Sequence, residues 1–255
     1  MSTEKITGFP ALFPEGGLQR NDATARFQLG QIAMDVFGNF YRYIKANEAL
    51  AVGQCVTAVA KAAWDTSIVV DGALAAAGVY TIHVDGIVTA RAAGYYAGYY
   101  ISQATAAGLG VGYRIKEHAA FVASSEVDVI LDDITLETFA DDAVLYIHNP
   151  YIMEKTDATT ELIMGVAIGT ITSGYFGWIQ VGGHCRRVAA GHSTSAAIVL
   201  NEPLAPLASP EGAVQGQEGA DEDDIFEASN SPLIALQAVA ANTTGYIEAK
   251  FCRIV

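Results

Sequence analysis

Short β-branched and aromatic runs separated by glycine turns are the feature of this chain that most constrains its fold. Phe40–Ile44, Cys55–Val59 and Val79–Val84 have the composition of strands. No long stretch repeats its apolar residues at the 3.6-residue period of a helix. Many short strands joined by glycine turns predict an all-β protein, built from β-sandwich or barrel-like units.

Two Asp-Gly pairs lie between such runs. Asp71-Gly72 follows an apolar run, and Asp85-Gly86 separates residues 79–84 from residues 87–89. Glycine accepts the positive φ that tight hairpin turns require. We therefore predict a β-hairpin at each Asp-Gly pair.

A glycine and aromatic motif occurs twice. In Gly94–Ile101 and in Gly174–Ile179, a glycine precedes two aromatic residues, and a second glycine, an aromatic residue and an isoleucine follow. Each copy leads through basic residues to an apolar run. We interpret this as an internal duplication of one β unit. Segments 94–132 and 174–202 should then fold alike, with their glycines at bends where the chain comes close to another strand.

The chain divides by composition into three parts. Residues 1–26 contain prolines and a Gly-Gly pair and indicate an extended N-terminal arm. Residues 27–160 form a predicted first β unit and residues 161–255 a second, which contains a long acidic loop at 205–232. The run Asp221–Asp224 should face solvent, because burying adjacent carboxylates without cations is costly.

The overall composition limits the class of partner. Of the 255 residues, 51% are hydrophobic and 16% are charged, so a sizeable core can form and much outer surface suits burial against another molecule. The net charge of −14 disfavours a broad nucleic-acid interface and an anionic membrane surface. The N-terminus lacks the apolar segment of a signal peptide, and no run has the length of a membrane helix. We expect a protein made in the cytoplasm, with no nucleic-acid or membrane partner.

The histidines and cysteines do not form a recognisable metal or redox motif. His184-Cys185 with His192 comes nearest to a ligand cluster, but neighbouring residues on a strand point to opposite faces. The three cysteines, Cys55, Cys185 and Cys252, lie far apart without a CxxC pair and are interpreted as small buried thiols. We expect no metal, no cofactor and no disulfide framework.

Two groups of side chains leave a choice between chemistry and structure. The pairs Asp132-Asp133 and Asp141-Asp142 contain carboxylates that acid–base catalysis could use. A role in keeping the protein surface solvated accounts for these residues equally well. Seven aromatic residues could form a sugar-binding platform or contribute to the core and to subunit interfaces. We favour the structural role for both groups and predict no catalytic residue. The seven aromatics are Tyr95, Tyr96, Tyr99, Tyr100, Tyr175, Phe176 and Trp178.

Two segments resemble parts of auxiliary head proteins of tailed bacteriophages, the decoration or cement proteins of the capsid. They are Phe40–Ala46 followed by Ala49–Gly53, and the stretch Gly174–Gly183. The resemblance implies a β-rich, non-enzymatic virion protein that binds the major capsid protein, often as a trimer.

From the resemblance and the composition we expect a homo-oligomer, with a trimer favoured, that docks on the capsid through an apolar contact. The apolar residues of the arm, Phe9, Leu12 and Phe13, are the candidate contact residues. An arm of this kind either lies on another molecule or folds back on its own domain. The alternatives are a carbohydrate-binding or polysaccharide-acting β protein, and another virion part such as a head-fibre or tail protein.

Overall fold

The computed structural model describes most of the chain, and the described residues confirm the all-β prediction. These residues lie in strands, bridges, turns and bends, and none of them lies in a helix. The described ranges are 11–12, 17–59, 65–70, 77–103, 112–139, 143–158, 161–191, 197–207, 209–216, 232–240 and 245–252.

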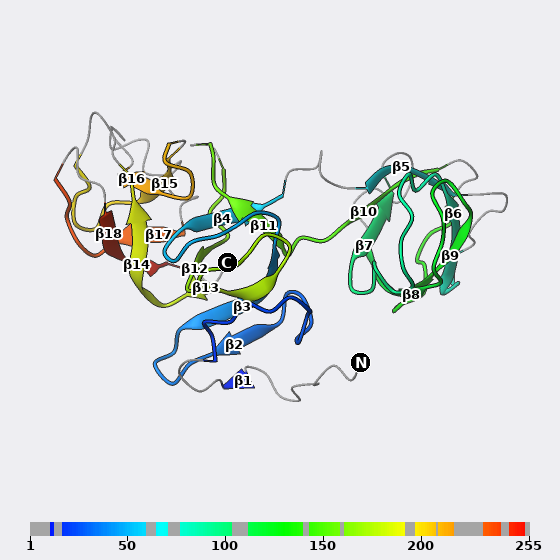
Figure 1. Ribbon diagram of the computed structural model, residues 1–255, viewed down its shortest axis with the longest axis horizontal. Helices are drawn as coiled ribbons and strands as arrows, with labels where there is room; N and C mark the ends of the chain where they lie inside the picture. The colour runs from blue at the N-terminus through cyan, green and yellow to red at the C-terminus, as the bar shows by residue number, and fades with distance from the viewer. Residues whose placement is uncertain are drawn as a thin grey trace. The chain divides into compact units, whose positions relative to one another are not determined.

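The chain forms two compact units (Figure 1). Unit 1 consists of Met1–Val59 and Pro150–Val255, and unit 2 consists of Ala60–Asn149. This division differs from the boundary at residue 160 expected from the sequence. The composition changes near residue 160. However, Thr156, just before that residue, is buried, and its backbone is hydrogen-bonded to Cys55 and Gly212, so this part of the chain lies inside unit 1.

The first sheet of unit 1 closes on itself. Its order is β1-β2-β3-β11-β4-β12-β13, and β13 also pairs with β3, so that β3, β11, β4, β12 and β13 form a closed ring. The strands are β1 (Ala11–Leu12), β2 (Ile32–Met34), β3 (Phe40–Ala46), β4 (Cys55–Ala58), β11 (Ile152–Lys155), β12 (Gly165–Ala167) and β13 (Phe176–Gly182).

The pairing of β3 with β13 is buried on both faces. Ile44 and Ile179 belong to one apolar cluster, and Tyr43 and Trp178 belong to another. Trp178 lies directly opposite Tyr43, with 5.1 Å between the ring centroids. Phe27 covers both rings at 5.2 and 5.3 Å. Aromatic groups of this size supply much of the apolar burial available to a small unit.

The second sheet of unit 1 shares a core with the first. Its order is β15-β16-β14-β18-β17, and a bridge between Pro203 and Ile234 joins its outer strands. Its buried residues pack with Cys55 and Val166 of the first sheet. The strands are β14 (His184–Ala190), β15 (Leu204–Pro206), β16 (Val214–Gly216), β17 (Leu233–Ala235) and β18 (Gly245–Phe251).

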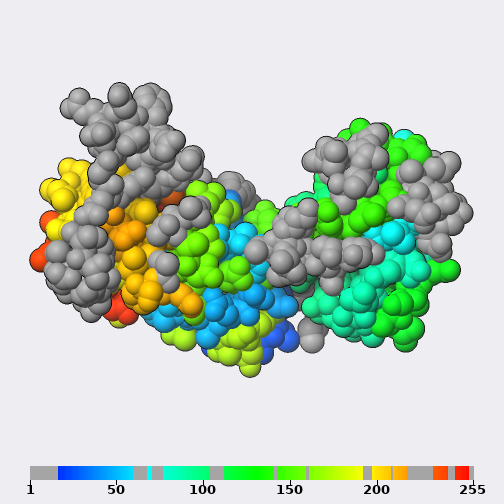
Figure 2. Space-filling view, turned by 90° about the horizontal axis from the view of Figure 1, so that it is seen from above, coloured from blue at the N-terminus to red at the C-terminus, as the bar shows by residue number. Residues whose placement is uncertain are grey.

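Unit 2 is a closed barrel in the order β10-β5-β6-β9-β8-β7. Inward residues alternate with outward ones along β9 and β10, as barrel strands require. Figure 2 shows the described residues of unit 2, cyan to green, gathered in one rounded body. The strands are β5 (Asp65–Val70), β6 (Thr81–Asp85), β7 (Tyr100–Gln103), β8 (Gly112–His118), β9 (Val127–Leu131) and β10 (Val144–His148).

Unit 2 is inserted between two neighbouring strands of unit 1. Strands β4 and β11 are antiparallel, with Ala58 opposite Met153, and the Val59 amide donates to the carbonyl of Ile152 at 3.1 Å. Within unit 2, the first and last strands, β5 and β10, also pair. The insertion therefore starts and ends at adjacent points, an arrangement that domain insertion tolerates well.

The predicted internal duplication is wrong. Strands β7, β8 and β9 of segment 94–132 belong to one barrel, whereas β13 and β14 of segment 174–202 belong to different sheets. The repeated motif reflects a shared turn. Gly94 and Gly174 both have positive φ, and the amide of the following tyrosine bonds three residues back in each copy.

The glycines of the motif also differ in their surroundings. A Cβ on Gly177 would lie 2.7 Å from Ile171 and 2.8 Å from the carbonyl of Arg20, so this glycine permits a close approach. A Cβ on Gly94 or Gly174 would meet nothing within 4 Å. Gly177 lies within β13 and not at a bend, and Ile171 and Arg20 lie outside the named strands, so none of these three positions shows the predicted bend against another strand.

The predicted hairpin at Asp85-Gly86 is also wrong. Residues 86–88 are not in a strand, although Gly86 has the expected positive φ of 85°. Strand β6 is already paired with β5 on one edge and with β9 on the other, so neither edge is open to residues 87–89. Asp71-Gly72 lies outside the described residues.

Candidate binding surface

Of the three contact residues predicted from the sequence, the structure describes only Leu12. Phe9 and Phe13 lie outside the described residues, as does the run Asp221–Asp224 of the acidic loop. Leu12 lies in β1, which pairs in parallel with β2, so this short part of the arm adds to the sheet of its own unit. For residues 11–12, the pairing agrees with the alternative in which the arm folds back on its own domain.

The most exposed large apolar residues of unit 1 form the tip of the β2–β3 hairpin. Val36 is 78% exposed and Phe37 is 72% exposed. They stand in the turn between Asp35 and Asn39, where glycine and small polar residues are usual. We refer to Val36 and Phe37 as the apolar tip.

The carboxylate of Asp35 holds the apolar tip in one conformation. Its Oδ1 accepts hydrogen bonds from the amides of Phe37 and Asn39, both at 2.9 Å. Its Oδ2 accepts from Asn39 Nδ2 and from the Tyr41 hydroxyl, both at 2.8 Å. Gly38 supplies the positive φ of 81° that closes the turn. Every strong acceptor position of Asp35 is therefore used to organise the tip.

These hydrogen bonds also change the titration of the tip. Burial acts to raise the pKa of Asp35, but the hydrogen bonds from Asn39, Tyr41 and Phe37 outweigh it, and the pKa lies below its ordinary value. Burial, followed by the hydrogen bond to Asp35, raises the pKa of the Tyr41 hydroxyl. At neutral pH, Asp35 is thus ionised and Tyr41 is a donor.

The hairpin is also fixed to the second sheet. The side-chain oxygen of Asn39 accepts a hydrogen bond from the amide of His184, the first residue of β14, at 2.9 Å. Gly183 has a positive φ, and a Cβ there would lie 2.3 Å from Asn39 Oδ1. The base of the turn therefore contacts unit 1 closely while its two apolar side chains face solvent.

A second turn of unit 1 exposes apolar residues in a similar way. Val199 and Leu200 are exposed, and the carboxylate of Glu202 accepts from the amide of Val199 at 2.7 Å. The Asn201 amide bonds the carbonyl of Ala235 at 2.9 Å, which fixes the turn to the end of β17. Apolar side chains on carboxylate-capped turns thus occur twice in unit 1.

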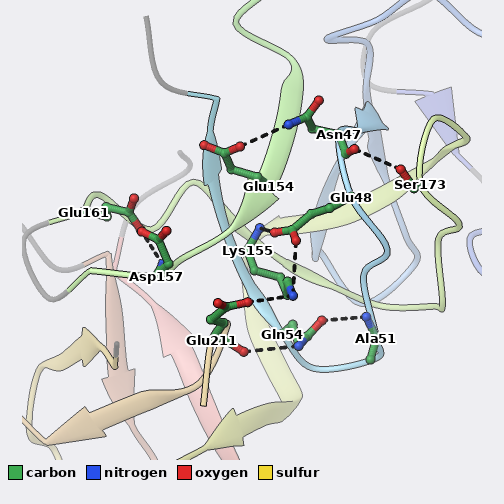
Figure 3. A network of polar contacts seen from close by, with 10 residues as sticks. All are labelled: Asn47, Glu48, Ala51, Gln54, Glu154, Lys155, Asp157, Glu161, Ser173 and Glu211. Carbon is green, nitrogen blue, oxygen red and sulfur yellow. Dashed lines mark hydrogen bonds and ion pairs between the residues drawn. The ribbon is translucent and has the colours of Figure 1, made fainter. Parts of the chain in front are cut away.

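A polar network joins the two sheets of unit 1 (Figure 3). Lys155 Nζ lies 2.8 Å from Glu211 and 3.2 Å from Glu48, and the Lys155 amide donates to Glu48 at 2.7 Å. The hydrogen bond to Glu211, despite partial burial, raises the pKa of Lys155. Because Lys155 is on β11 and Glu211 follows β15, the network connects the two sheets.

A second part of this region caps a loop. The Glu161 carboxylate accepts from the amides of Asp157 at 2.7 Å and Ala158 at 3.3 Å. Burial raises the pKa of Glu161, and the neighbouring carboxyl of Asp157 adds to the effect. The hydrogen bonds and ion pairs described for these side chains all lie within unit 1, so a structural role accounts for the network.

The histidines have separate environments. His83 Nδ1 lies 2.7 Å from Asp128 across β6 and β9, with Glu126 at 3.4 Å, and this ion pair is exposed. His118 is buried: its Nε2 accepts from the amide of Tyr96 at 3.0 Å, so Nδ1 donates to the carbonyl of Ala119 at 2.7 Å.

His184 is exposed and Cys185 is buried, as the alternation along a strand predicted. His192 lies outside the described residues. Within the ranges given above, no group of three His, Cys, Asp or Glu side chains could hold a metal ion. No helix of the described chain is long and apolar enough to cross a membrane.

Three of the seven aromatic residues are buried, and two of the half-buried ones, Tyr175 and Phe176, pack against core clusters. Tyr96, Tyr99 and Trp178 are buried, and Tyr95 is exposed. The guanidinium of Arg91 lies over the ring of Tyr95 at 4.5 Å, so one face of this ring already has a partner. The remaining three, Tyr100, Tyr175 and Phe176, are half-buried.

Two of the three cysteines match the prediction of buried thiols. Cys55 and Cys185 are buried in the shared core of unit 1, and Cys252 is exposed. Burial raises the pKa of Cys55 well above its ordinary value and that of Cys185 to about 11.

Comparison with known proteins found no match among family models, curated proteins or solved structures. The apolar tip was not predicted from the sequence as a candidate site. Gly38-Asn39 has the composition of a turn, and the bulky pair Val36-Phe37 next to it is the informative signal. Residues of that kind in a turn need either a core to enter or a partner to cover them.

Proposed function

We propose that this chain is a virion structural protein that decorates or cements the capsid of a tailed bacteriophage by binding its major coat subunits. The observation that supports the proposal most is the apolar tip. Its two large apolar side chains are exposed to solvent, and the Asp35 carboxylate fixes the turn that presents them by accepting four hydrogen bonds within it. The likeness of Phe40–Ala46 and Gly174–Gly183 to auxiliary head proteins adds to it.

Binding of this kind stabilises a shell by mass action. A protein that binds the assembled shell, and not the free coat subunits, lowers the free energy of the assembled state. A cementing contact spans neighbouring coat subunits and buries apolar surface of both. We propose that the chain acts as a homo-oligomer, with a trimer favoured, because repeated contacts on a symmetric shell then reinforce one another.

The proposal is tested with the full chain and empty shells of the phage's major coat protein. We expect the chain to sediment with shells at a saturable stoichiometry and to raise the temperature at which they dissociate. Binding should depend weakly on salt, because apolar burial is not screened as charge pairs are. A chain that stays in the supernatant at every concentration contradicts capsid binding.

Fractionated virions distinguish the remaining alternatives. Recovery of the chain with tails or fibres rather than with heads would assign it to another virion part. Saturable binding to a polysaccharide that is lost on changing Tyr95 would favour a carbohydrate-binding protein.

A further inference from the structure

We propose that the acidic segment 217–231 of this chain docks on a basic face of its own second sheet. The basic face consists of the exposed cations Arg186, Arg187 and Lys250 on β14 and β18. The segment itself lies outside the described residues. The inference goes beyond capsid binding and does not depend on it.

The basic face is an exception in an acidic chain. Along β14 and β18, exposed residues alternate with residues buried in the shared core of unit 1, so the exposed side chains gather on the surface that faces away from this core. Three of these side chains are Arg or Lys, and one, Glu248, is a carboxylate. The whole chain has a net charge of −14, so an excess of cations on one strand pair is informative.

The three cations also lack the ion pairs that other cations make. Arg114, for example, lies 3.0 Å from the carboxylate of Asp132. No ion pair joins a cation of the basic face to any other residue that the structure describes. Glu248 lies 3.3 Å from His184 instead. The basic face therefore has capacity for carboxylates from elsewhere.

Arg187 is held ready for such a partner. Its guanidinium lies 3.9 Å from the centroid of the Tyr246 ring. The ring in turn lies against Gly53, where a Cβ would be 2.9 Å from it. Stacking on a ring leaves the N–H edge of a guanidinium accessible, and this edge can bind a carboxylate through two parallel hydrogen bonds. A guanidinium that is already oriented loses less conformational entropy on binding.

The described ends of the segment lie at opposite ends of the basic face. Strand β16 runs parallel to β14, with Val214 opposite Ala190, the last residue of β14. Strand β17 begins opposite Phe251, whose amide bonds the carbonyl of Gly183, just before β14. The segment between them must therefore return along the length of β14, which is about 20 Å. A chain of this length reaches up to roughly 50 Å when extended, so the path is feasible.

Charge selects between the two routes outside the sheet. The inner side of the sheet is filled, because its buried residues pack with Cys55 and Val166 of the first sheet. One outer route crosses β15 and the other crosses β14 and β18. The route over β15 begins beside Glu202, whose carboxylate would lie 2.5 Å from a Cβ on Gly216. An acidic segment is repelled there and attracted by the basic face.

The segment fits this face better than a nucleic acid does. It contains no Lys or Arg, and its acidic residues are Glu218, Asp221–Asp224 and Glu227. Three cations can pair with several of these carboxylates at the surface, where the carboxylates stay partly hydrated. The connection to β16 and β17 also gives the segment an effective concentration on the order of millimolar. A phosphate backbone has no such connection and is repelled by the net charge of −14.

Carbodiimide cross-linking of the full chain tests the docking, because this reagent joins a lysine amine directly to a carboxylate in contact with it. Lys250 should cross-link to a carboxylate of segment 217–231 in protein of monomer mass, as identified by mass spectrometry of its peptides. Lys155 with Glu211, at 2.8 Å, is the positive control (Figure 3). Lys116, an exposed lysine of unit 2, should give no link to the segment. Salt at about 1 M should lower the Lys250 yield, because it screens surface charge pairs.

Two variants separate docking on this face from general attraction to cations. Arg187→Ser should lower the yield of the Lys250 link about two- to five-fold, as expected for the loss of one exposed charge pair. Lys116→Ser, which removes an exposed cation of unit 2, should leave that yield unchanged. Both substituted side chains are exposed, so both variants should keep the circular dichroism spectrum of the wild type.

Three results would overturn the proposal. One is the absence of a link from Lys250 to the segment under conditions in which Lys155 links to Glu211. Another is a link found only at dimer mass, between isotopically labelled and unlabelled copies, which would assign the segment to the face of a neighbouring copy. The third is retention of single-stranded DNA by the wild type and not by Arg187→Ser, which would assign the face to nucleic acid. None of these results decides whether the chain binds capsids.

Discussion

The two units build closed β structures by different routes. In unit 2, half of the barrel pairings join strands that are consecutive in the sequence, namely β5–β6, β7–β8 and β8–β9, and all of them lie within residues 60–149. In unit 1, the main pairings join distant segments: β3 pairs with β13, and β4 pairs with β11 across the whole insertion. In Figure 2, blue and orange residues of unit 1 accordingly lie within one body.

The comparison shows which unit depends on contacts between distant segments of the chain. Unit 2 closes with its own core, so it can be carried as an insert without contributing strands to unit 1. Unit 1 depends on contacts between its two chain segments and carries the apolar tip on β2–β3. We therefore expect unit 2 to be a separable module, and the proposed capsid contact is assigned to unit 1 as part of that proposal.

The largest expected effect comes from cutting the chain at this division. Replacing residues 60–149 with a short Asn-Gly turn should leave unit 1 folded, because β4 and β11 then form an ordinary hairpin. Residues 60–149 should also fold alone. Calorimetry of the full chain should show two transitions, each reproduced by one of the fragments.

If the unit 1 fragment aggregates while the unit 2 fragment is stable, the insertion is required for the fold of unit 1. A single cooperative transition of the full chain would contradict separable units.

Core truncations should destabilise one unit at a time. Trp178→Ala should lower the unfolding free energy of unit 1 by about 3–5 kcal/mol, and Leu145→Ala should lower that of unit 2 by about 2–5 kcal/mol. Each variant should shift one calorimetric transition and leave the other unchanged. A shift of both transitions by one substitution would mean that the units are coupled.

The cysteines provide a chemical comparison, because all three belong to unit 1. Cys252 is exposed, whereas Cys55 and Cys185 are buried with raised pKa values. We expect one thiol to react rapidly with a disulfide reagent in the native protein and all three after denaturation. Cys252→Ser should abolish the rapid reaction. Fast labelling of Cys55 would show that the shared core of unit 1 opens readily.

The smallest effects concern pH, and they have opposite directions in the two units. The lowered pKa of Asp35 gives unit 1 stability that is complete above the ordinary value of 3.8 and is lost as pH falls through the lowered value. The raised pKa of His83, due first to its hydrogen bond with Asp128, gives unit 2 stability below pH 6.5 that is lost as pH rises through the raised value.

Two substitutions isolate these contributions. The difference in stability between the wild type and Asp35→Asn should shrink as pH falls below 3.8. The difference for Asp128→Asn should be small, because His83 is exposed, and should shrink as pH rises through the raised pKa of His83. A nuclear magnetic resonance titration of His83 that is unchanged by Asp128→Asn would contradict the ion pair.

Local patterns predicted the strands better than their partners. The runs at Phe40–Ile44 and Cys55–Val59 are strands because alternating and β-branched residues suit a buried pleated surface. Their partners could not be predicted, since a strand pattern does not specify which distant strand fills each edge. The same limit explains the failed Asp85-Gly86 hairpin, where β9 rather than the next run pairs with β6.

The candidate site could be predicted only in part for a similar reason. Gly38-Asn39 correctly indicated a turn, but the exposure of Phe37 depends on Asp35 bonding to Tyr41 and Asn39 in three dimensions. The repeated Gly-aromatic motif was over-interpreted. Its two copies share a turn, whereas we had predicted that they share a whole β unit. A short motif carries local geometry, not topology.

Electron cryomicroscopy of empty coat shells saturated with the full chain tests the central claim of capsid binding most directly. Capsid binding predicts density for both units on the shell surface, with the Val36–Phe37 turn of unit 1 at the contact with the coat. Bare shells at saturating concentrations of the chain would contradict it.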